Sequence, residues 1–235
     1  MPSPPCYVLR AMTERPILFS GPMVRALLEG RKTQTRRVVT WQPPEWVGEI
    51  ATGRYHPTKT DRDGEEYPGS EIFGAYDDQG EWGCRCPWAP GDLLYVRETF
   101  VDGVVPKYRA DYPDDQTEII VGNNEHLPVW GVAWKPSIHM PKAAARIWLR
   151  VTDVRVERLQ EITDEDAIAE GVTEFGGQFK GAYHAGDHMS GVSARECFAR
   201  LWDSLNAKRG YGWDVNPWVW AITFSRATRT EEPEK

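Results

Sequence analysis

The sequence lacks the features that mark membrane or secreted proteins. No apolar run approaches the roughly 20 residues that cross a bilayer. The first ten residues lack the cationic start and apolar stretch of a signal peptide. The chain has only four cysteines, at positions 6, 84, 86 and 197. Cys84 and Cys86 are too close for an easy mutual disulfide. We therefore expect a cytoplasmic protein with reduced thiols and no membrane contact.

The sequence also lacks a recognisable metal-binding pattern. The cysteine spacing does not form the two pairs of a zinc ribbon. Cys84 and Cys86 together with a histidine are an open alternative as a metal site. His184 and His188 lie four residues apart, but the glycines around them argue against a helix that would align them. We expect neither a metal nor another cofactor.

Basic residues are outnumbered by acidic residues in this sequence. The 235 residues carry 28 Lys and Arg against 35 Asp and Glu, a formal charge of −7. A uniformly basic surface that attracts polyanions is therefore excluded. Against this background the segment GRKTQTRR, residues 30–37, packs four cations and two hydroxyls into eight residues. Such a local cluster on an acidic chain indicates a small anion site, with phosphate as its commonest ligand.

Periodicity and capping residues predict a mixture of strands and three short helices. Proline at position 22, after Ser20, and Gly30 frame one helix; Thr163 before an acidic turn and Ser193 before Glu196 begin two more. Alternating apolar residues predict strands, with a break in phase at Asp153 in the longest one. The expected helices are 22–29, 164–170 and 194–206, and the expected strands are 32–39, 93–100, 146–156 and 218–225.

Two polar, turn-rich stretches interrupt this pattern. Residues 41–87 and 101–133 contain many Gly, Pro and Asp and little periodicity, so we expect loop-rich insertions, and a small hairpin is an open alternative in the first. The prediction is a single domain over residues 15–226, with flexible tails at 1–14 and 227–235. Its fold class is α+β, a small β-barrel with short helices covering its ends. We expect a monomer.

Eleven tryptophans are many for this length. Aromatic rings can stack on unpaired bases. The alternative for any single tryptophan is packing in the core or against a long loop.

Five separated sequence blocks agree, in order, with a known family. They are the first helix with GRKTQTRR, then PGDLLYVRETF, the segment 136–172, LWDSLN and NPWVWAITF. In these blocks the chain resembles the ASCH family of the PUA-like superfamily, and most of all its longer members from bacteriophages and prophages. The resemblance implies a small β-barrel that binds RNA or modified nucleosides. It covers about residues 15–40, 88–100 and 134–226, and leaves the two insertions outside.

The same resemblance implies an activity. One branch of the family consists of small bacterial acetylcytidine amidohydrolases, which use a threonine, a lysine and a glutamate. Matched by motif, these positions are Thr35, Lys32 and Glu170. Lys32 would then deprotonate the Thr35 hydroxyl, and Glu170 would protonate the leaving amine. In the alternative, Lys32 contacts a phosphate, Thr35 is an ordinary strand residue and Glu170 pairs with an arginine.

The remaining candidates would bind substrate or RNA. Arg37 shares the strand face of Thr35, and is favoured over Arg36 for the pocket. Either Arg97 or Glu98 could reach the same groove, although a buried Arg–Glu pair is equally compatible. His139 precedes the long strand, and Trp218 begins the last one. The full set of expected binding residues is Arg31, Arg36, Arg37, Arg97, Glu98, His139 and Trp218.

Two functions from different classes are therefore expected. The first is a hydrolase that removes an acyl group from the exocyclic amine of a cytidine-type nucleoside. The second is a non-catalytic RNA-binding module that uses the same cations for phosphates, and ribonuclease activity is a further alternative.

Overall fold

A computed structural model describes residues 13–103, 105–112, 117–121, 125–174, 183–185, 189–191 and 193–228. The predicted tails at 1–14 and 227–235 lie largely outside these residues. Within them, Glu14 begins the first strand and Ala227 ends the last one, so these two strands extend by one residue beyond the predicted domain limits.

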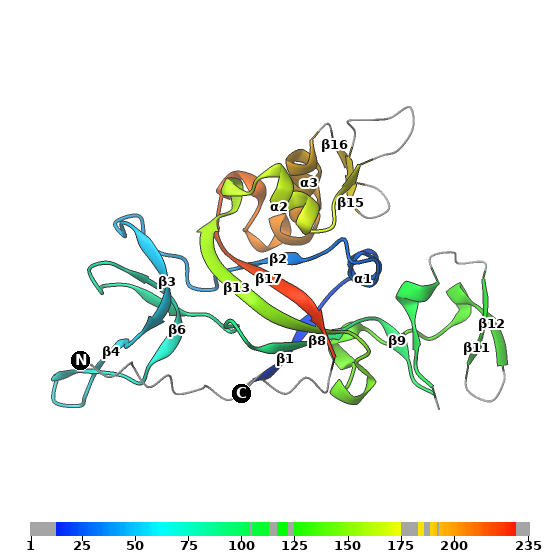
Figure 1. Ribbon diagram of the computed structural model, residues 1–235, viewed down its shortest axis with the longest axis horizontal. Helices are drawn as coiled ribbons and strands as arrows, with labels where there is room; N and C mark the ends of the chain where they lie inside the picture. Colours follow the sequence, from blue (N-terminus) through cyan, green and yellow to red (C-terminus); the bar gives the residue numbers. More distant parts are fainter. Residues whose placement is uncertain are drawn as a thin grey trace, which may run out of the picture.

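A five-stranded mixed sheet forms the centre of the molecule (Figure 1). Strand β1 pairs in parallel with β8, and the other neighbours are antiparallel. In order across the sheet, the strands are β1 (Glu14–Leu18), β8 (Leu93–Arg97), β13 (Trp148–Arg158), β17 (Trp218–Ala227) and β2 (Gln34–Val38). The predicted α+β class is confirmed at this level.

The long strands β13 and β17 bend strongly across the sheet (Figure 1). Their register shifts between Val151 and Asp153, which confirms the break in alternation predicted at Asp153. Such a bulge bends a strand and increases its twist. The inner side of the bend holds the main core, which includes Phe19, Val24 and Ile222.

Helix α1 (Gly21–Leu28) joins the two edge strands, β1 and β2. Pro22 lies in its first turn as expected, but the Ser20 side chain makes no capping hydrogen bond. Gly30 follows the helix with a φ of +75°, a conformation that glycine adopts without strain. This turn directs the chain into β2.

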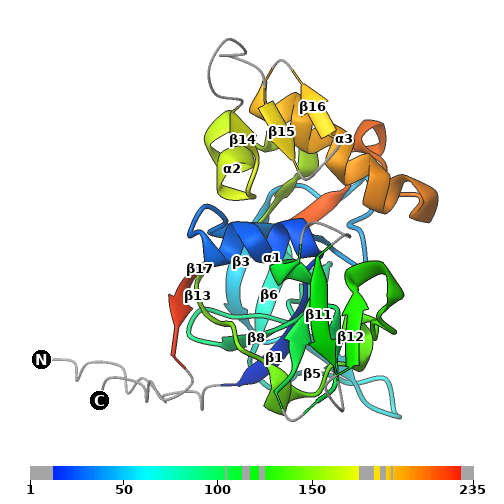
Figure 2. The same ribbon diagram turned by 90° about the vertical axis from the view of Figure 1, so that its right-hand side faces the viewer.

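Helices α2 (Asp164–Ala169) and α3 (Ala194–Asn206) cover the face of β2 and β17 that points away from the main core (Figure 2). Both predicted caps are confirmed, since Thr163 accepts from the amide of Asp166 and Ser193 accepts from the amide of Glu196. Small strands β14 (Thr173–Glu174), β15 (Tyr183–Ala185) and β16 (Met189–Gly191) lie beside α3.

The first insertion is more regular than predicted. Strands β3 (Ile50–Tyr55), β6 (Ile72–Asp77) and β7 (Gly83–Arg85) form an antiparallel sheet, and β4 (Thr58–Thr60) pairs with β5 (Glu66–Pro68). A small hairpin, the open alternative, is present as β4 and β5, but the expectation of loops in the rest of this insertion was wrong. Glycines interrupt the apolar alternation there. One of them, Gly74, is required because a Cβ would lie 2.1 Å from the carbonyl oxygen of Cys84.

The second insertion forms short hairpins beside the end of β8. Strand β9 (Phe100–Val101) pairs with β10 (Lys107–Tyr108), and β11 (Glu118–Val121) pairs with β12 (Glu125–Pro128). The predicted strand 93–100 therefore ends at Arg97. Single-turn 3-10 helices occur here and between elements later in the chain: Arg109–Asp111, Val129–Gly131, Ser137–His139, Lys142–Ala144, Leu159–Glu161, Ala207–Arg209 and Trp213–Val215.

Candidate functional site

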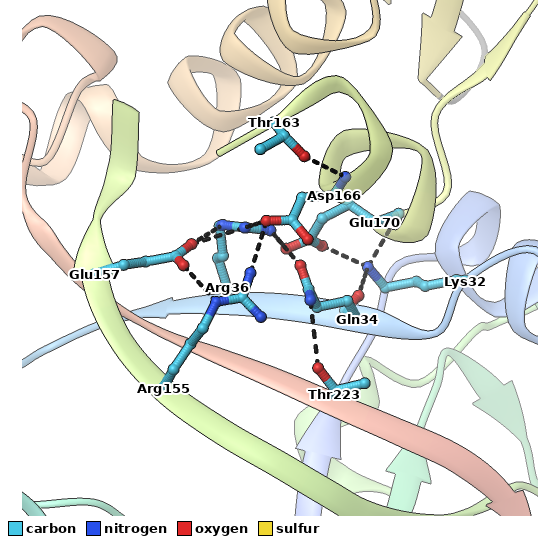
Figure 3. Close-up of polar contacts among 9 residues, drawn as sticks. All are labelled: Lys32, Gln34, Arg36, Arg155, Glu157, Thr163, Asp166, Glu170 and Thr223. Atoms are coloured by element: carbon cyan, nitrogen blue, oxygen red, sulfur yellow. Dashed lines mark hydrogen bonds and ion pairs between the residues drawn. The ribbon is translucent and has the colours of Figure 1, made fainter. Parts of the chain in front are cut away.

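The loop before β2 and the end of α2 bring Lys32 and Glu170 together (Figure 3). Lys32 Nζ donates to Glu170 Oε2 at 2.7 Å, to the Glu170 carbonyl at 2.8 Å and to the Gln34 carbonyl at 2.9 Å. Both residues are buried, at 2% and 5% exposure. Burial lowers the pKa of Lys32, although the charge of Glu170 opposes this effect. The three ammonium protons are all used in these contacts.

Glycine at position 171 allows this close approach. It follows α2 with a φ of +102°, and a Cβ there would lie 3.6 Å from the Cβ of Lys32 and 3.2 Å from that of Ala26. The backbone amide of Thr33 also donates to the carbonyl of Ala169 at 2.8 Å. The end of α2 is therefore held against the GRKTQTRR segment by both main-chain and side-chain bonds.

Arg36 lies at the centre of a second set of ion pairs (Figure 3). Its guanidinium contacts Glu157 Oε1 and Asp166 Oδ2, both at 2.7 Å, and Glu170 Oε1 at 3.5 Å. Arg155 also bonds to Glu157 and Asp166, at 2.6 Å each. Burial alone would raise the pKa of Asp166, but Arg36 and Arg155 hold it below its ordinary value. Arg36 is thus neutralised by protein carboxylates rather than free for a phosphate.

Thr35 lies on the opposite face of β2 from Gln34 and Arg36. It pairs across the sheet with Ile222, a residue of the main core, and is itself 2% exposed. The structure therefore brings two members of the predicted catalytic set into contact, Lys32 with Glu170. It places Thr35 within the packed interior, whereas the three protons of the Lys32 ammonium go to Glu170 and to the Gln34 carbonyl.

A groove of about 630 Å³ opens beside this cluster, between the start of α1, strand β2 and helix α3. We call it the Arg37 groove. Its size is that of an ordinary small-ligand pocket. The residues that matter for its chemistry are Ser20, Arg37, Trp88, Trp202, Asn206 and Arg209.

The groove contains two arginines that no carboxylate of the described residues pairs with. Arg37 donates to the Leu18 carbonyl at 2.8 Å and stacks over Phe19 at 5.3 Å from the ring centre. Arg209 donates to Asn206 Oδ1 at 3.2 Å. Burial lowers the pKa of Arg37; the negative charge of Glu170 opposes this effect, and the positive charge of Arg209 adds to it. Two cations that repel each other in one groove favour an anionic ligand.

The other predicted binding residues have structural partners. Arg31 bonds to Glu29 and to Thr173 Oγ1, at 2.7 and 2.9 Å. Arg97 donates to the Met140 carbonyl at 2.7 Å and to the Ile138 carbonyl. These arginines hold neighbouring segments together, and neither lines the Arg37 groove.

Glu98 forms the buried Arg–Glu pair that the sequence left open. Arg146 binds both of its carboxylate oxygens, at 2.9 and 3.0 Å, and also binds Asp111. His139 is exposed in a 3-10 turn, two residues after Ser137 of the groove. Trp218 is half-buried, with the Arg158 guanidinium 4.6 Å from its ring centre. None of these three positions lines the groove.

Sequence reasoning missed Arg209, Asn206, Trp88 and Trp202 as groove residues. Arg209 follows α3 in a 3-10 turn, and only the packing of α3 against β2 brings it near Arg37. The available signal was the apolar stripe of α3, which indicated that the helix packs on the sheet but not over which strand.

No group of three or more His, Cys, Asp or Glu among the described residues could hold a metal ion. Burial raises the pKa of Cys84, and raises that of Cys86 to about 12 and that of Cys197 to about 11. His188 lies outside the described residues, as does the side chain of His184.

Comparisons of the chain with protein-family models, with curated proteins and with solved structures give no match. The part of the chain that the structure describes contains no helix with the length and apolar character needed to span a bilayer.

Proposed function

We propose that this protein binds RNA or a modified nucleoside in the Arg37 groove. The observation that carries the proposal is the pair of arginines, Arg37 and Arg209, that face one groove and form no ion pair with a carboxylate of the described residues. A phosphate between them would relieve their mutual repulsion and accept charge-assisted hydrogen bonds from both.

The groove also offers what a base requires. Trp88 is half-buried on its wall, and Ser20 supplies a hydroxyl group beside the two arginines. Aromatic faces stack on unpaired bases at about 1–3 kcal/mol per base, whatever the sequence. The proposed ligand is therefore a single nucleotide or one nucleotide of an unpaired strand.

The proposal includes the finer fold assignment. The bent sheet, with β1 and β2 at its edges and α1 between them, is compatible with a PUA-like barrel of the ASCH family. The resemblance of the five sequence blocks supports this assignment, and the blocks GRKTQTRR and LWDSLN contribute Arg37 and Asn206 to the groove.

Binding is tested by fluorescence anisotropy with a labelled single-stranded RNA and with a nucleoside monophosphate as competitor. Arg37→Gln and Arg209→Gln should each weaken binding of both by at least tenfold, since each removes a charged hydrogen bond. Arg62→Gln, in the exposed turn between β4 and β5, is the matched control and should bind as the unaltered protein does. Equal binding by all four proteins would exclude the groove.

One observation favours a second function, the amidohydrolase. Lys32 and Glu170 are in contact in a buried site, and burial lowers the Lys32 pKa, as a general base requires. Within the ion pair, a proton would first pass from the Lys32 ammonium to the Glu170 carboxylate, which leaves a neutral amine and a carboxylic acid. The Thr35 oxygen would then attack the acyl carbon while the Lys32 amine takes the hydroxyl proton. The carbon–nitrogen bond would then break as Glu170 protonates the amine, and water would release the acyl group from Thr35. Thr35 would first have to become accessible, because it does not line the groove.

A single incubation separates these functions. The protein is incubated with acetylcytidine and with short RNAs, and the products are identified by mass spectrometry. Loss of the acetyl group supports the hydrolase, shortened RNA supports a ribonuclease, and unchanged substrates together with measurable RNA binding support the binding module.

A further inference from the structure

The first insertion contains a second cavity, of about 510 Å³, which the proposed RNA function does not use. It lies in the lobe formed by β3, β4, β5, β6 and β7, which stands to the side of the central sheet (Figure 1). We call it the insertion pocket. Its walls are unusually rich in aromatic rings: Trp41, Tyr55, Tyr76 and Trp82.

Strand register places two of these rings together. Tyr55 and Tyr76 lie on one face of the β3–β6 pair, with their ring centres 4.9 Å apart. Gly83 makes room for them, because a Cβ there would lie 2.7 Å from the Tyr55 hydroxyl oxygen. The glycine-rich composition that hid these strands from sequence analysis is therefore what allows the tyrosines to line a cavity.

The two tryptophans complete the aromatic wall. Trp82 is buried, and Trp41 lies 6.3 Å from it, between ring centres, while remaining 61% exposed. A tryptophan held against a pocket yet open to solvent presents a free indole face. Trp is the aromatic residue whose face attracts cations most strongly.

The charges around the pocket have one sign. Asp77, Asp78 and Glu81 line it, and no lysine or arginine does. Asp77 accepts from the amide of Trp82 at 2.8 Å, and Asp78 accepts from the Gln79 amide at 2.9 Å, so both partners are neutral. Glu81 forms no ion pair with any described residue. Such a pocket repels phosphate and attracts a cation.

We propose that the insertion pocket binds an alkylated ammonium group, held over the indole face of Trp41 and neutralised by Asp78 and Glu81. An alkylated ammonium combines positive charge with apolar surface and needs few hydrogen bonds, which matches aromatic walls with carboxylates at their edge. The group could belong to a free small cation or to a methylated lysine side chain, and both carry the same chemistry.

The test uses the full chain and follows the indole N–H resonances of the tryptophans by NMR, with Trp41→Phe to assign the Trp41 signal. The probes are choline, a peptide with one trimethyllysine, the same peptide with unmodified lysine, and 3,3-dimethylbutan-1-ol, a neutral analogue of choline. Saturable shifts of the Trp41 signal with both alkylated probes are expected. The neutral analogue should bind roughly 2- to 30-fold more weakly than choline, the range of a cation–π contribution.

Variants locate the site. Trp41→Ala, followed through the indole signal of Trp82, should weaken choline binding by a similar 2- to 30-fold. The double variant Asp78→Asn with Glu81→Gln, which keeps Trp41, should also bind choline more weakly than the unaltered protein. Trp46→Ala is the matched control, since Trp46 lies in the same segment, is equally exposed at 61%, and does not line the pocket. If the trimethyllysine peptide binds more tightly than choline, the alkylated ammonium belongs to a methylated lysine of a partner chain. If choline binds more tightly, it belongs to a free small cation.

The proposal is overturned if no probe gives a saturable shift, if the neutral analogue binds as tightly as choline, or if Trp41→Ala binds choline unchanged. These results do not depend on the Arg37 groove, so the two sites succeed or fail separately.

Discussion

At the scale of single residues, the ion pair between Lys32 and Glu170 is as much a structural element as a catalytic candidate. Lys32 is 2% exposed, and its ammonium satisfies one side chain and two carbonyls. A buried pair adds little net stability, but removing one partner leaves a buried charge uncompensated. Any loss of activity on changing Lys32 must therefore be separated from loss of the fold.

We expect Lys32→Met to lower the free energy of unfolding by about 3–5 kcal/mol, because Glu170 is left buried without its main partner. The double variant Lys32→Met with Glu170→Met should recover much of this loss. Urea denaturation followed by circular dichroism measures both. A double variant no more stable than the single one would contradict this account of the pair.

Asp166 should make stability depend on acid pH. Arg36 and Arg155 hold its pKa below the ordinary value of 3.8, so its contribution is fully present above that pH and is lost as pH falls through the lower, folded-state pKa. Asp166→Asn should cost roughly 1.5–3 kcal/mol at pH 7, the worth of a hydrogen bond to a charged group.

Thermal unfolding at pH 7, 5 and 3 tests this expectation. The difference in stability between the unaltered protein and Asp166→Asn should be constant from pH 7 to 5 and shrink at pH 3. A difference that grows as the pH falls would show that Asp166 is not held ionised by the arginines. In an Arg155→Gln background, which lacks one of the two cations, Asp166→Asn should cost less stability at pH 7 than it does in the unaltered protein.

Residue identity was partly predictable from the sequence. Lys32 and Glu170 were expected in one site and lie in contact, whereas Arg36 was expected to bind ligand and is instead neutralised by Glu157 and Asp166. The reason is burial. The local sequence shows which side chains are cationic. Carboxylates that are distant in sequence, on β13 and α2, determine which of these cations form ion pairs within the protein.

At the scale of elements, α2 is short but determines the geometry of the site, because its end carries Glu170. Gly171 closes it with a φ of +102° and lies close to Ala26 and Lys32. Gly171→Ala should therefore combine backbone strain of about 1–3 kcal/mol with crowding of its neighbours. Gly64→Ala is a matched control, since Gly64 also has a positive φ, of +89°, but would have nothing within 4 Å of its Cβ.

Chemical denaturation of the two glycine variants separates strain from packing. Gly171→Ala should be the less stable of the two. Equal stabilities would mean that the contact between the end of α2 and the Lys32 loop adds no constraint.

The elements themselves show where sequence patterns suffice. Alternation predicted β13, its bulge at Asp153 and β17, because one face of each is buried in the core. Strands β3, β6 and β7 were missed because Gly53, Gly74 and Gly83 stand where apolar residues would mark a strand. At these positions glycine allows a close approach of neighbouring groups. The residue types that usually mark a strand are therefore absent.

At the scale of the whole molecule, the net charge of −7 opposes any long-range attraction of RNA. The proposed binding would then depend on local contacts, and the Arg37 groove offers two arginines without an ion-paired carboxylate among the described residues. The packing of α3 against β2 brings Arg37 near Arg209. This packing could not be predicted from either segment alone.

This arrangement predicts a weak dependence of RNA binding on salt. Each phosphate neutralised on a single strand contributes roughly 0.7 to the slope of log affinity against log salt concentration. Two contacts give a slope of about 1.4, and Arg37→Gln or Arg209→Gln should reduce it to about 0.7. Anisotropy titrations between 50 and 300 mM salt, on the order of a sixfold range, resolve these values. A slope above about 3 that neither variant changes would show that RNA is held by cations elsewhere on the surface. In that case the Arg37 groove would not be the RNA-binding site.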